Sequence, residues 1–244
     1  IKKKECFWVQ TENSVYTGIK VVLATGGKAS PKLGSDGSGF VLARKLGHTI
    51  VEPVPALIGL KCKESYYETI SGVRIQAGIS LYIAQEMEPV AMEVGELQLT
   101  NYGISGIPVF QVSRFAARAL SEGNSVYARI DYLPAISLDE LVLLLKKRFL
   151  VSEKNASEAL VGLLPSKLIP VFLQQGGIKA TMNATKVNEQ QLRQLASQLK
   201  RQKTEIVETN GLKTSLLTDI MEIIYSDKNI AVCVKPVGLD SEAE

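Results

Sequence analysis

The chain has 244 residues, of which 45% are hydrophobic and 22% are charged, as in an ordinary soluble globular protein. Its 28 Lys and Arg against 25 Asp and Glu leave a net charge of +3, spread along the sequence, which argues against the clustered basic face of a nucleic-acid-binding protein. No apolar run approaches the roughly 18 residues of a membrane span, so we expect no membrane partner.

The cysteines and the histidine limit the chemistry further. Cys6, Cys62 and Cys233 are isolated and odd in number, which predicts reduced thiols in a cytoplasmic protein rather than a disulfide frame or a zinc site. His48 is the only histidine, so a metal site built from histidines is excluded. Because His48 follows Gly47 at a predicted helix end, where the helix dipole favours a cation, we expect it to have a structural role.

The first fifty residues predict a small α/β segment. Two short strands at 6–10 and 14–17 precede a buried strand at 20–24, the corner Thr25-Gly26-Gly27 and an apolar helix at 40–46. Nucleotide-binding α/β proteins use this order of strand, Gly-rich bend and helix to bring backbone amides close to a cofactor. The alternative is a tight turn in which the glycines supply a positive φ.

The middle of the chain shows the alternation of a β unit. Short strands at roughly ten-residue spacing predict a small barrel or sandwich. Between two of them, apolar residues at helical spacing predict a helix from Pro108 to Leu120, ended by Gly123. The expected strands are 57–62, 72–83, 96–100 and 125–130.

The residues before that helix form a second candidate site. Gly103-Ile104-Ser105-Gly106 at a helix N-terminus could hold an anion, and Tyr102 could stack on a substrate or hydrogen-bond to it. Tyr102, Gly103 and Ser105 are therefore candidate substrate-binding residues. The alternative is a turn that joins a strand to the helix.

From residue 135 to residue 203 the pattern is helical. Ser137 and Glu140 form a predicted capping box, and so do Asn188 and Gln191. Four short helices fit a compact helical module, after which a strand at 204–208 is expected. The expected helices are 141–150, 152–163, 166–175 and 189–202.

Two further groups of charged residues have no predicted chemistry. Asp131 near Pro134 has no partner carboxylate, so we assign it no catalytic role. The run Lys200-Arg201-Gln202-Lys203 is predicted to be the charged end of the last helix, where the dipole favours cations. As an RNA-binding patch this run is too short and lacks interleaved aromatic residues.

Several motifs together resemble the aminoacetone-oxidase-like flavoproteins, a bacterial family of NAD(P)/FAD-dependent oxidoreductases. In order and spacing they cover residues 1 to about 211. The runs that carry the resemblance are Leu23-Ala24-Thr25-Gly26-Gly27-Lys28, Leu46-Gly47-His48-Thr49-Ile50, Gly95-Glu96-Leu97, Tyr102-Gly103-Ile104-Ser105-Gly106, Ile130-Asp131 and Leu163-Leu164-Pro165.

The resemblance implies an α+β fold in which a two-part FAD-binding domain is interrupted by a β-barrel insert with a helical subdomain. The implied parts are a partial FAD-binding segment at 1–54, the barrel at 55–134 with a strand returning at 204–210, the helical subdomain at 135–203, and a tail at 212–244.

The resemblance also implies FAD as the cofactor. The cofactor-binding residues would be Ala24, Thr25, Gly26, Gly27 and Lys28. The family's FAD site begins with a Gly-x-Gly-x-x-Gly turn and closes with a second glycine-rich segment, and neither is in this sequence. We therefore expect the chain to need those parts of the FAD domain as partners and to bind FAD poorly alone. Asp36 and Ser38 stand where the family has Thr and Asp.

The tail has a resemblance of its own. Residues 220–236 predict two strands around the polar turn Asp227-Lys228-Asn229. The run from Ile223 to Leu239 resembles the entry strands of large-subunit-type pseudouridine synthases, which implies the start of an RNA-modifying domain or a gene junction.

These observations predict a fragment of an FAD-dependent oxidoreductase whose insert caps the flavin and an amine or another small-molecule substrate. Three alternatives stay open: a non-catalytic interaction or lid module, part of an RNA pseudouridine synthase fusion, and a chain that is inert out of context. A nucleic-acid partner is expected only if the tail domain is present.

Overall fold

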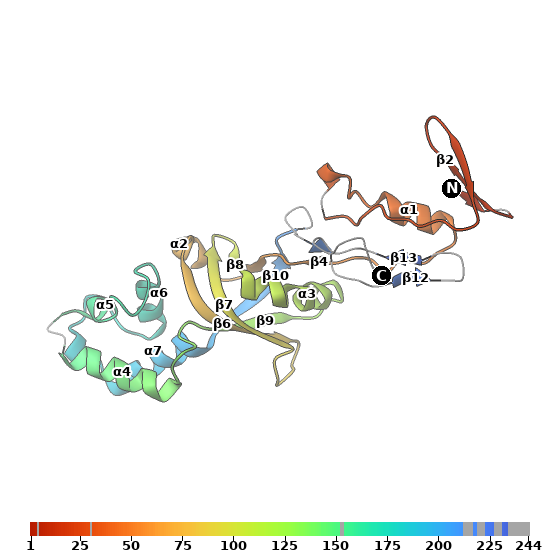
Figure 1. Cartoon of the computed structure of the whole chain (residues 1–244). Helices are drawn as coiled ribbons and strands as arrows, with labels where there is room; N and C mark the ends of the chain where they lie inside the picture. The colour runs from red at the N-terminus through yellow and green to blue at the C-terminus, as the bar shows by residue number, and fades with distance from the viewer. Residues whose placement is uncertain are drawn as a thin grey trace. The chain divides into compact units, whose positions relative to one another are not determined.

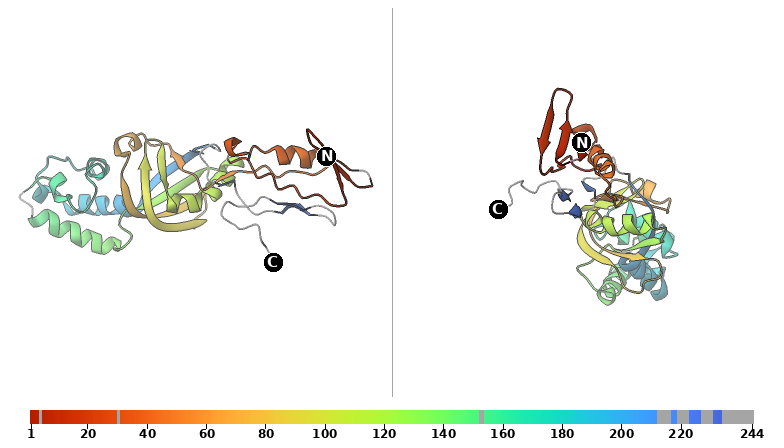
Figure 2. Two further views of the ribbon diagram at one scale, coloured as in Figure 1. Left: turned by 45° about the horizontal axis from the view of Figure 1, so that its top comes forward. Right: turned by 90° about the vertical axis from the view of Figure 1, so that its right-hand side faces the viewer.

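The computed structural model describes residues 1–3, 5–29, 31–151, 154–211, 217–218, 223–226 and 231–233. The chain divides into two compact units, one made of Ile1–Ile58 with Gly211–Glu244 and the other of Gly59–Asn210. The colours of Figure 1 and Figure 2 follow the residue number, so the start of the first unit is red and orange and the second unit runs from gold to blue.

The first unit contains a small antiparallel sheet and one α-helix among its described residues. The strands lie in the order β1-β2-β3, and α1 follows a short 3-10 helix. Phe7, Leu23 and Ala43 are buried together and form the core of this unit. The bounds are β1 Lys2–Lys3, β2 Phe7–Gln10, β3 Val15–Gly18, η1 Pro31–Leu33 and α1 Ser38–Lys45.

Helix α1 ends as the sequence predicts. Gly47 adopts a φ of 91°, a left-handed conformation that glycine reaches without strain. The N–H of His48 then donates a 3.1 Å hydrogen bond to the carbonyl of Ala43, and the N–H of Gly47 donates one of 3.0 Å to Arg44. The main chain at His48 therefore closes the C-terminus of α1.

The buried strand expected at 20–24 is not formed. Leu23 alone makes a bridge contact and is buried, whereas Val22 is 74% exposed. A strand is defined by hydrogen bonds to a neighbouring strand, and none of the described strands pairs with this segment. The apolar run did not predict this outcome, because pairing depends on a partner that local sequence does not reveal.

The second unit is built on a closed antiparallel barrel. Its strands follow the order β10-β5-β8-β7-β6-β9, and β10 pairs with both β5 and β9 to close it. On β6 the alternating residues Ala77, Ile79 and Leu81 are fully buried and point to the barrel core. The bounds are β5 Leu60–Cys62, β6 Arg74–Ile83, β7 Ala91–Thr100, β8 Gly103–Gly106, β9 Val126–Asp131 and β10 Gln202–Thr209.

Two helices within the barrel sequence pack on its core. Helix α3, Ile107–Ser121, buries Val109, Val112 and Ala116 in the same hydrophobic cluster as the inward barrel residues. The four-residue helix α2, Tyr67–Ile70, buries both of its end residues there. The helix predicted at 108–120 is thus confirmed.

The predicted helical module is confirmed, and it lies between β9 and β10 in the sequence (Figure 1). Its helices share one hydrophobic cluster with the barrel. The bounds are α4 Leu138–Val151, α5 Ala156–Ala159, α6 Leu168–Gln175, η2 Ala184–Lys186 and α7 Glu189–Arg201.

Both predicted capping boxes are present. The N–H of Ser137 donates to Glu140 Oε2 at 2.7 Å, and the N–H of Glu140 donates to Ser137 Oγ at 3.3 Å. The reciprocal pair of Asn188 and Gln191 has distances of 3.1 and 2.9 Å. These short-range hydrogen bonds satisfy amides that have no intrahelical partner, so the helix starts were predictable from local sequence.

Two predicted elements of the second unit were wrong. Within the described residues, the helix expected at 152–163 is shorter and consists only of α5. This helix begins after Asn155, which forms a capping box with Glu158. The chain then turns at Gly162, where φ is 80°. The turn expected at Gly103–Gly106 is the barrel strand β8. This short glycine-rich strand lacks the apolar–polar alternation that marks longer strands, so the sequence does not reveal it. Barrel packing rather than local preference sets its conformation.

The described part of the tail contains three short strands. β11, Leu217–Thr218, pairs with β4, Pro55–Ala56, and β12, Ile223–Ser226, pairs antiparallel with β13, Ala231–Cys233. The two predicted tail strands are therefore confirmed, whereas their turn at 227–229 lies outside the described residues. Together the two units confirm the predicted α+β class with a barrel and a helical module.

Candidate functional site

The glycine-rich corner of the first unit folds against the loop that follows it. The N–H of Gly37 donates a 2.9 Å hydrogen bond to the carbonyl of Gly27. Gly26 has a φ of 72°, and a Cβ placed on it would lie 2.6 Å from Ser35 Oγ. A Cβ on Gly39 would overlap Thr25 Oγ1. These glycines are therefore required by packing of the loop on itself, which is the alternative that the sequence left open.

The outer edge of this corner stays accessible within its own unit. Ala24, Thr25 and Gly26 are exposed, whereas Gly27 is buried. Three successive residues thus present main chain at the surface, and one of them is a glycine that offers no side chain to obstruct a ligand. This geometry suits close approach of a flat cofactor to the backbone.

Lys28 is not a free cation. Its Nζ lies 2.8 Å from Glu52 Oε1 and 5.7 Å from the centre of the Phe40 ring, and Arg44 approaches the other oxygen of Glu52 at 3.4 Å. The hydrogen bond from Lys28 lowers the pKa of the Glu52 carboxyl. Lys28 therefore holds the corner to residue 52, and a phosphate group would have to compete with that carboxylate.

The N-terminus of α1 is occupied by a carboxylate from the same loop. Asp36 Oδ1 accepts the N–H of Ser38 at 2.9 Å, and that backbone hydrogen bond lowers the pKa of the Asp36 carboxyl. Helix N-termini attract anions, and here a fixed negative charge already lies in that place. The corner is thus suited to an uncharged part of a cofactor and not to its phosphates.

The second predicted site lies in the other unit. Gly103 begins β8, and a Cβ on it would lie 2.5 Å from the carbonyl oxygen of Leu60. Ser105 is only 8% exposed. The ring of Tyr102 covers Gly59, because a Cβ at position 59 would lie 2.6 Å from the Tyr102 hydroxyl. Tyr102 is half-buried and so keeps one part of its ring accessible, whereas Gly103 and Ser105 are strand residues enclosed by the barrel.

A buried polar cluster in the barrel was missed by sequence reasoning. The hydroxyl of Tyr67 donates to Thr204 Oγ1 at 3.0 Å, and that hydroxyl donates in turn to the carboxylate of Glu64. Burial raises the pKa of the neighbouring Cys62 thiol to about 11. No local signal links these residues, because residues 64 and 204 belong to strands and loops far apart in the chain. The cluster has structural rather than redox character, since a protonated thiol is a poor nucleophile.

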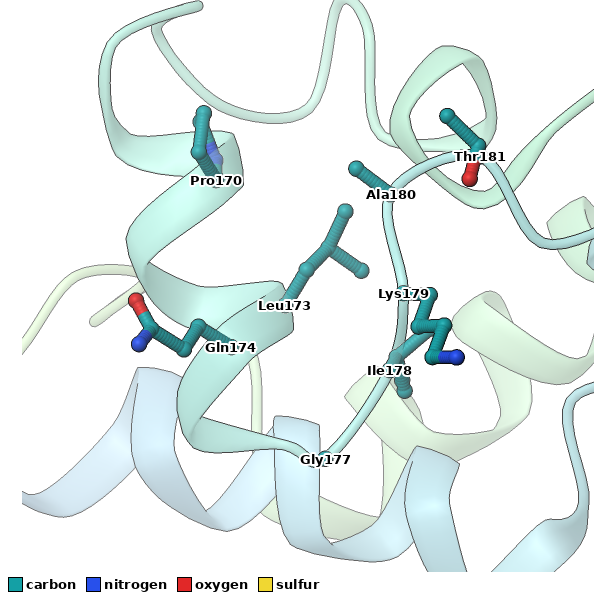
Figure 3. Close-up of a pocket in the computed structure, with 8 residues that line it drawn as sticks. All are labelled: Pro170, Leu173, Gln174, Gly177, Ile178, Lys179, Ala180 and Thr181. Carbon is teal, nitrogen blue, oxygen red and sulfur yellow. The ribbon is translucent and has the colours of Figure 1, made fainter.

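Two of the surface hollows in the described part of the chain lie on the helical module. The larger, of about 510 Å³, is an open groove between the second half of α6 and the loop at 177–181 (Figure 3). Leu173 points toward that loop, so the floor of the groove is apolar, and Lys179 contributes a cation at its side. The smaller hollow, of about 210 Å³, lies between α4 and η2. Neither hollow contains a residue of the two predicted sites.

In the part of the chain that the structure describes, no group of three or more His, Cys, Asp or Glu could hold a metal ion. Among the same residues, no helix combines the length and apolar character needed to cross a bilayer.

The fold defines a closed antiparallel barrel with a helical module inserted before its last strand. Residues 54–217 match the family described as the HI0933-like protein barrel and H2TH domain, and the chain belongs to that family.

Three relatives place this family among larger proteins. The chain is 37% identical to a 3-dehydro-bile acid delta(4,6)-reductase of Clostridium scindens over 84% of its own length and 50% of that protein. It is 25% identical to ribosomal RNA dihydrouridine synthases of Haemophilus influenzae and Escherichia coli, over 71% and 89% of this chain and 40% and 52% of those proteins. The chain therefore spans about half the length of the curated relatives it matches.

Proposed function

We propose that this chain is part of a flavin-dependent reductase that saturates a carbon–carbon double bond conjugated to a carbonyl group. The observation that carries the proposal is the 37% identity to a reductase over 84% of this chain. The aminoacetone-oxidase-like resemblance predicts the same cofactor class, but the relatives favour reduction of a double bond over oxidation of an amine.

The names of the relatives describe one reaction type. A 3-dehydro bile acid has a ketone in conjugation with its ring double bonds, and dihydrouridine is uridine whose base has lost a double bond conjugated to a carbonyl. In both cases a hydride adds to the carbon distant from the carbonyl and a proton adds to the carbon beside it. The shared chemistry is a two-electron reduction in which a hydride and a proton add across an activated double bond.

Reduced FAD, when bound, supplies the hydride in such a reaction. We assign Ala24, Thr25 and Gly26 to the wall that contacts it, because their accessible main chain permits close approach. Gly27 and Lys28 support that wall, Gly27 through its carbonyl and Lys28 through Glu52. The carboxylate of Asp36 at the start of α1 makes this loop unsuitable for the pyrophosphate, which we assign to the remainder of the FAD domain.

The barrel and helical module would cap the substrate side. Tyr102 is the candidate contact, since its half-buried phenol can donate a hydrogen bond to a substrate carbonyl and so favour hydride addition. Gly103 and Ser105 would position Tyr102 through β8 rather than touch the substrate. The partners in this proposal are the remaining parts of the FAD domain and a small-molecule substrate, in a cytoplasmic protein.

RNA is a second candidate substrate. It is favoured by the two ribosomal RNA dihydrouridine synthases among the relatives. A non-catalytic lid module and a pseudouridine synthase fusion stay predictions; the second rests on a tail of which only short strands lie within the described residues.

The test uses the complete protein of which this chain is a part, purified and saturated with FAD. The protein is reduced without oxygen and mixed with a conjugated steroid ketone, a uridine-rich RNA or the saturated steroid ketone. Reoxidation by a conjugated acceptor, with no response to the saturated ketone, is the expected result. A protein without visible flavin absorption after FAD addition would refute the proposal.

A matched pair of variants tests the assigned wall. Gly26→Ala places a methyl group against Ser35 in a left-handed turn, whereas Gly34→Ala, with a φ of 93°, meets nothing within 4 Å. We expect Gly26→Ala to lower FAD occupancy at least several-fold and Gly34→Ala to retain it. Equal occupancy in both variants would remove the corner from the flavin site.

A further inference from the structure

The outer side of the barrel wall has a stacked pair of tyrosines flanked by two cations, in which Tyr82 is buried at 7% exposure and Tyr127 is half-buried. Tyr82 on β6 lies directly opposite Tyr127 on β9, and their rings are parallel within 1° at a centroid distance of 4.8 Å. Arg129 on β9 lies directly opposite Lys203 on β10. We call these four residues the tyrosine–cation face.

Strand alternation places this face outside the barrel. Val126, Ala128 and Ile130 of β9 are buried at 1% exposure or less and belong to the core. Tyr127 and Arg129, which alternate with them, therefore point outward. The aromatic and basic residues come from three strands that are far apart in the sequence.

The two cations are held against the rings. The guanidinium of Arg129 lies 4.8 Å from the centre of the Tyr82 ring, and Nζ of Lys203 lies 4.2 Å from the centre of the Tyr127 ring. Like charges directly opposite each other across two strands repel. An anion between Arg129 and Lys203 would remove that repulsion.

The acids on the same face are already neutralised by other lysines. Glu205, the cross-strand neighbour of Tyr127, pairs with Lys63 at 2.8 Å. Asp131, two residues after Arg129, pairs with Lys200 at 2.7 Å. Across the residues that the structure describes, Arg129 and Lys203 therefore form no ion pair, and their charge is uncompensated.

The surrounding charge has the same sign. Residues 135–203 contain eleven Lys and Arg against five Asp and Glu, a net charge of +6, whereas the rest of the chain carries 17 against 20, a net charge of −3. The even spread of charge expected from the total of +3 was wrong. Lys203 of this face lies at the start of β10, where the strongly basic module ends in the sequence.

We propose that the tyrosine–cation face binds a single-stranded segment of RNA. One phosphate lies between Arg129 and Lys203, and an unpaired base stacks on the ring of Tyr127 when the flexible Lys203 ammonium moves from that ring to the phosphate. Unpaired bases are needed because a duplex hides the faces that stack on aromatic rings. The inference rests on the RNA branch of the proposed function, yet binding at this face requires no flavin.

The sequence-based argument against RNA therefore fails on one point. The run at 200–203 lacks aromatic residues in sequence, but the barrel brings Tyr127 to Lys203 and Tyr82 to Arg129. Cations and rings are interleaved across strands instead of along one strand.

The test measures binding of a fluorescently labelled oligouridine to the flavin-free 244-residue chain by anisotropy across a salt series. Arg129→Gln with Lys203→Gln should weaken binding at least about tenfold and reduce the salt slope by about 0.7, since the two cations hold one phosphate and each phosphate contact in a single strand contributes about 0.7. The matched control is Lys147→Gln with Lys186→Gln, which removes two exposed cations of the helical module. Its affinity should fall less than about threefold.

Tyr127 is tested separately. Tyr127→Phe keeps the stacking ring and should bind as the natural chain does, whereas Tyr127→Leu should lose about tenfold in affinity. Thermal unfolding followed by circular dichroism identifies any variant that fails to fold.

Each remaining outcome decides against the inference. Equal losses in the two double variants would mean a diffuse electrostatic attraction, and equal affinity for inorganic polyphosphate or for oligothymidine would mean an anion or general single-strand site. RNA binding in a protein that reduces no double bond would refute the proposed function alone, and reductase activity without RNA binding would refute this inference alone.

Discussion

The hydroxyl of Tyr67 donates a 3.0 Å hydrogen bond to Oγ1 of Thr204, a residue 137 positions later in the chain. Both groups are buried, and the Thr204 hydroxyl donates its own hydrogen bond to the carboxylate of Glu64. The other oxygen of Glu64 accepts the N–H of Glu205 at 2.9 Å. This relay ties α2 and the loop before it to β10, the strand that closes the barrel.

Replacing Thr204 should destabilise the barrel more than replacing Tyr67. Thr204→Val keeps the volume but leaves the buried Tyr67 hydroxyl without its acceptor and Oε2 of Glu64 without its donor, so we expect the free energy of unfolding to fall by about 2–3 kcal/mol. Tyr67→Phe leaves the bond from Thr204 to Glu64 intact and should cost about 1 kcal/mol. Urea unfolding measures both, and equal costs would contradict the relay.

Lys200 should be a structural cation. Its Nζ contacts the Asp131 carboxylate at 2.7 Å and the carbonyls of Leu133 and Ile136 at 2.9 and 2.5 Å, and its side chain is only 11% exposed. Lys200→Met should lower the free energy of unfolding by about 2–4 kcal/mol, because it leaves a partly buried carboxylate unpaired. The control Arg193→Met removes an exposed pair with Glu189 and should cost about 0.5 kcal/mol or less in the same urea titration. Similar losses of unfolding free energy in the two variants would show that the pair of Lys200 and Asp131 stabilises the fold no more than an exposed ion pair does.

Gly106 should tolerate no side chain. It has a φ of 99°, and a Cβ on it would overlap the carbonyl oxygen of Glu96 on the adjacent strand. Gly106→Ala should therefore cost more than about 3 kcal/mol, combining a strained backbone with a clash inside the barrel. Gly123→Ala, with a φ of 80° and nothing within 4 Å, should cost about 1 kcal/mol. Thermal unfolding of the two variants tests the difference, and a stable Gly106→Ala protein would argue against the closed register of β7 and β8.

The thiol of Cys62 should react slowly at neutral pH. Burial raises its pKa from 9.0 to about 11, because the thiolate loses its hydration in the barrel. In a chain with Cys6→Ser and Cys233→Ser, alkylation of Cys62 should be much slower in the folded protein than in urea and should accelerate toward pH 11. Equal folded and unfolded rates at pH 7 would contradict this.

The same pKa predicts the direction of alkaline destabilisation. Above pH 9.0 the unfolded chain releases the Cys62 proton, whereas the folded chain keeps it until about pH 11. The free energy of unfolding should therefore decrease through this window. In Cys62→Ala the decrease should be smaller, as pH-dependent urea unfolding would show; an unchanged slope would mean that Cys62 does not contribute.

Short-range features were predictable from the sequence because the chemistry that fixes them lies within one helical turn. The capping residues Ser137 and Asn188, the buried stripe of α7 and the end of α1 at Gly47 all belong to this class. The strand expected at 20–24 and the turn expected at 103–106 failed because strand pairing depends on partners elsewhere in the chain. The corner at 24–28 was recognised as a unit, but its fixed carboxylates at 36 and 52 emerged only from the fold.

The run Lys200-Arg201-Gln202-Lys203 separates what the sequence predicts from what only the tertiary structure determines. Sequence alone determined that a capped amphipathic helix ends here among cations and that a strand follows. Only the folded barrel decided that Lys200 turns inward to Asp131 while Lys203 turns outward onto Tyr127. The physical reason is that α7 ends at Arg201, where the backbone changes from helical to extended. Neighbouring cations therefore point into different surroundings, both of them formed by β9, a strand much earlier in the sequence.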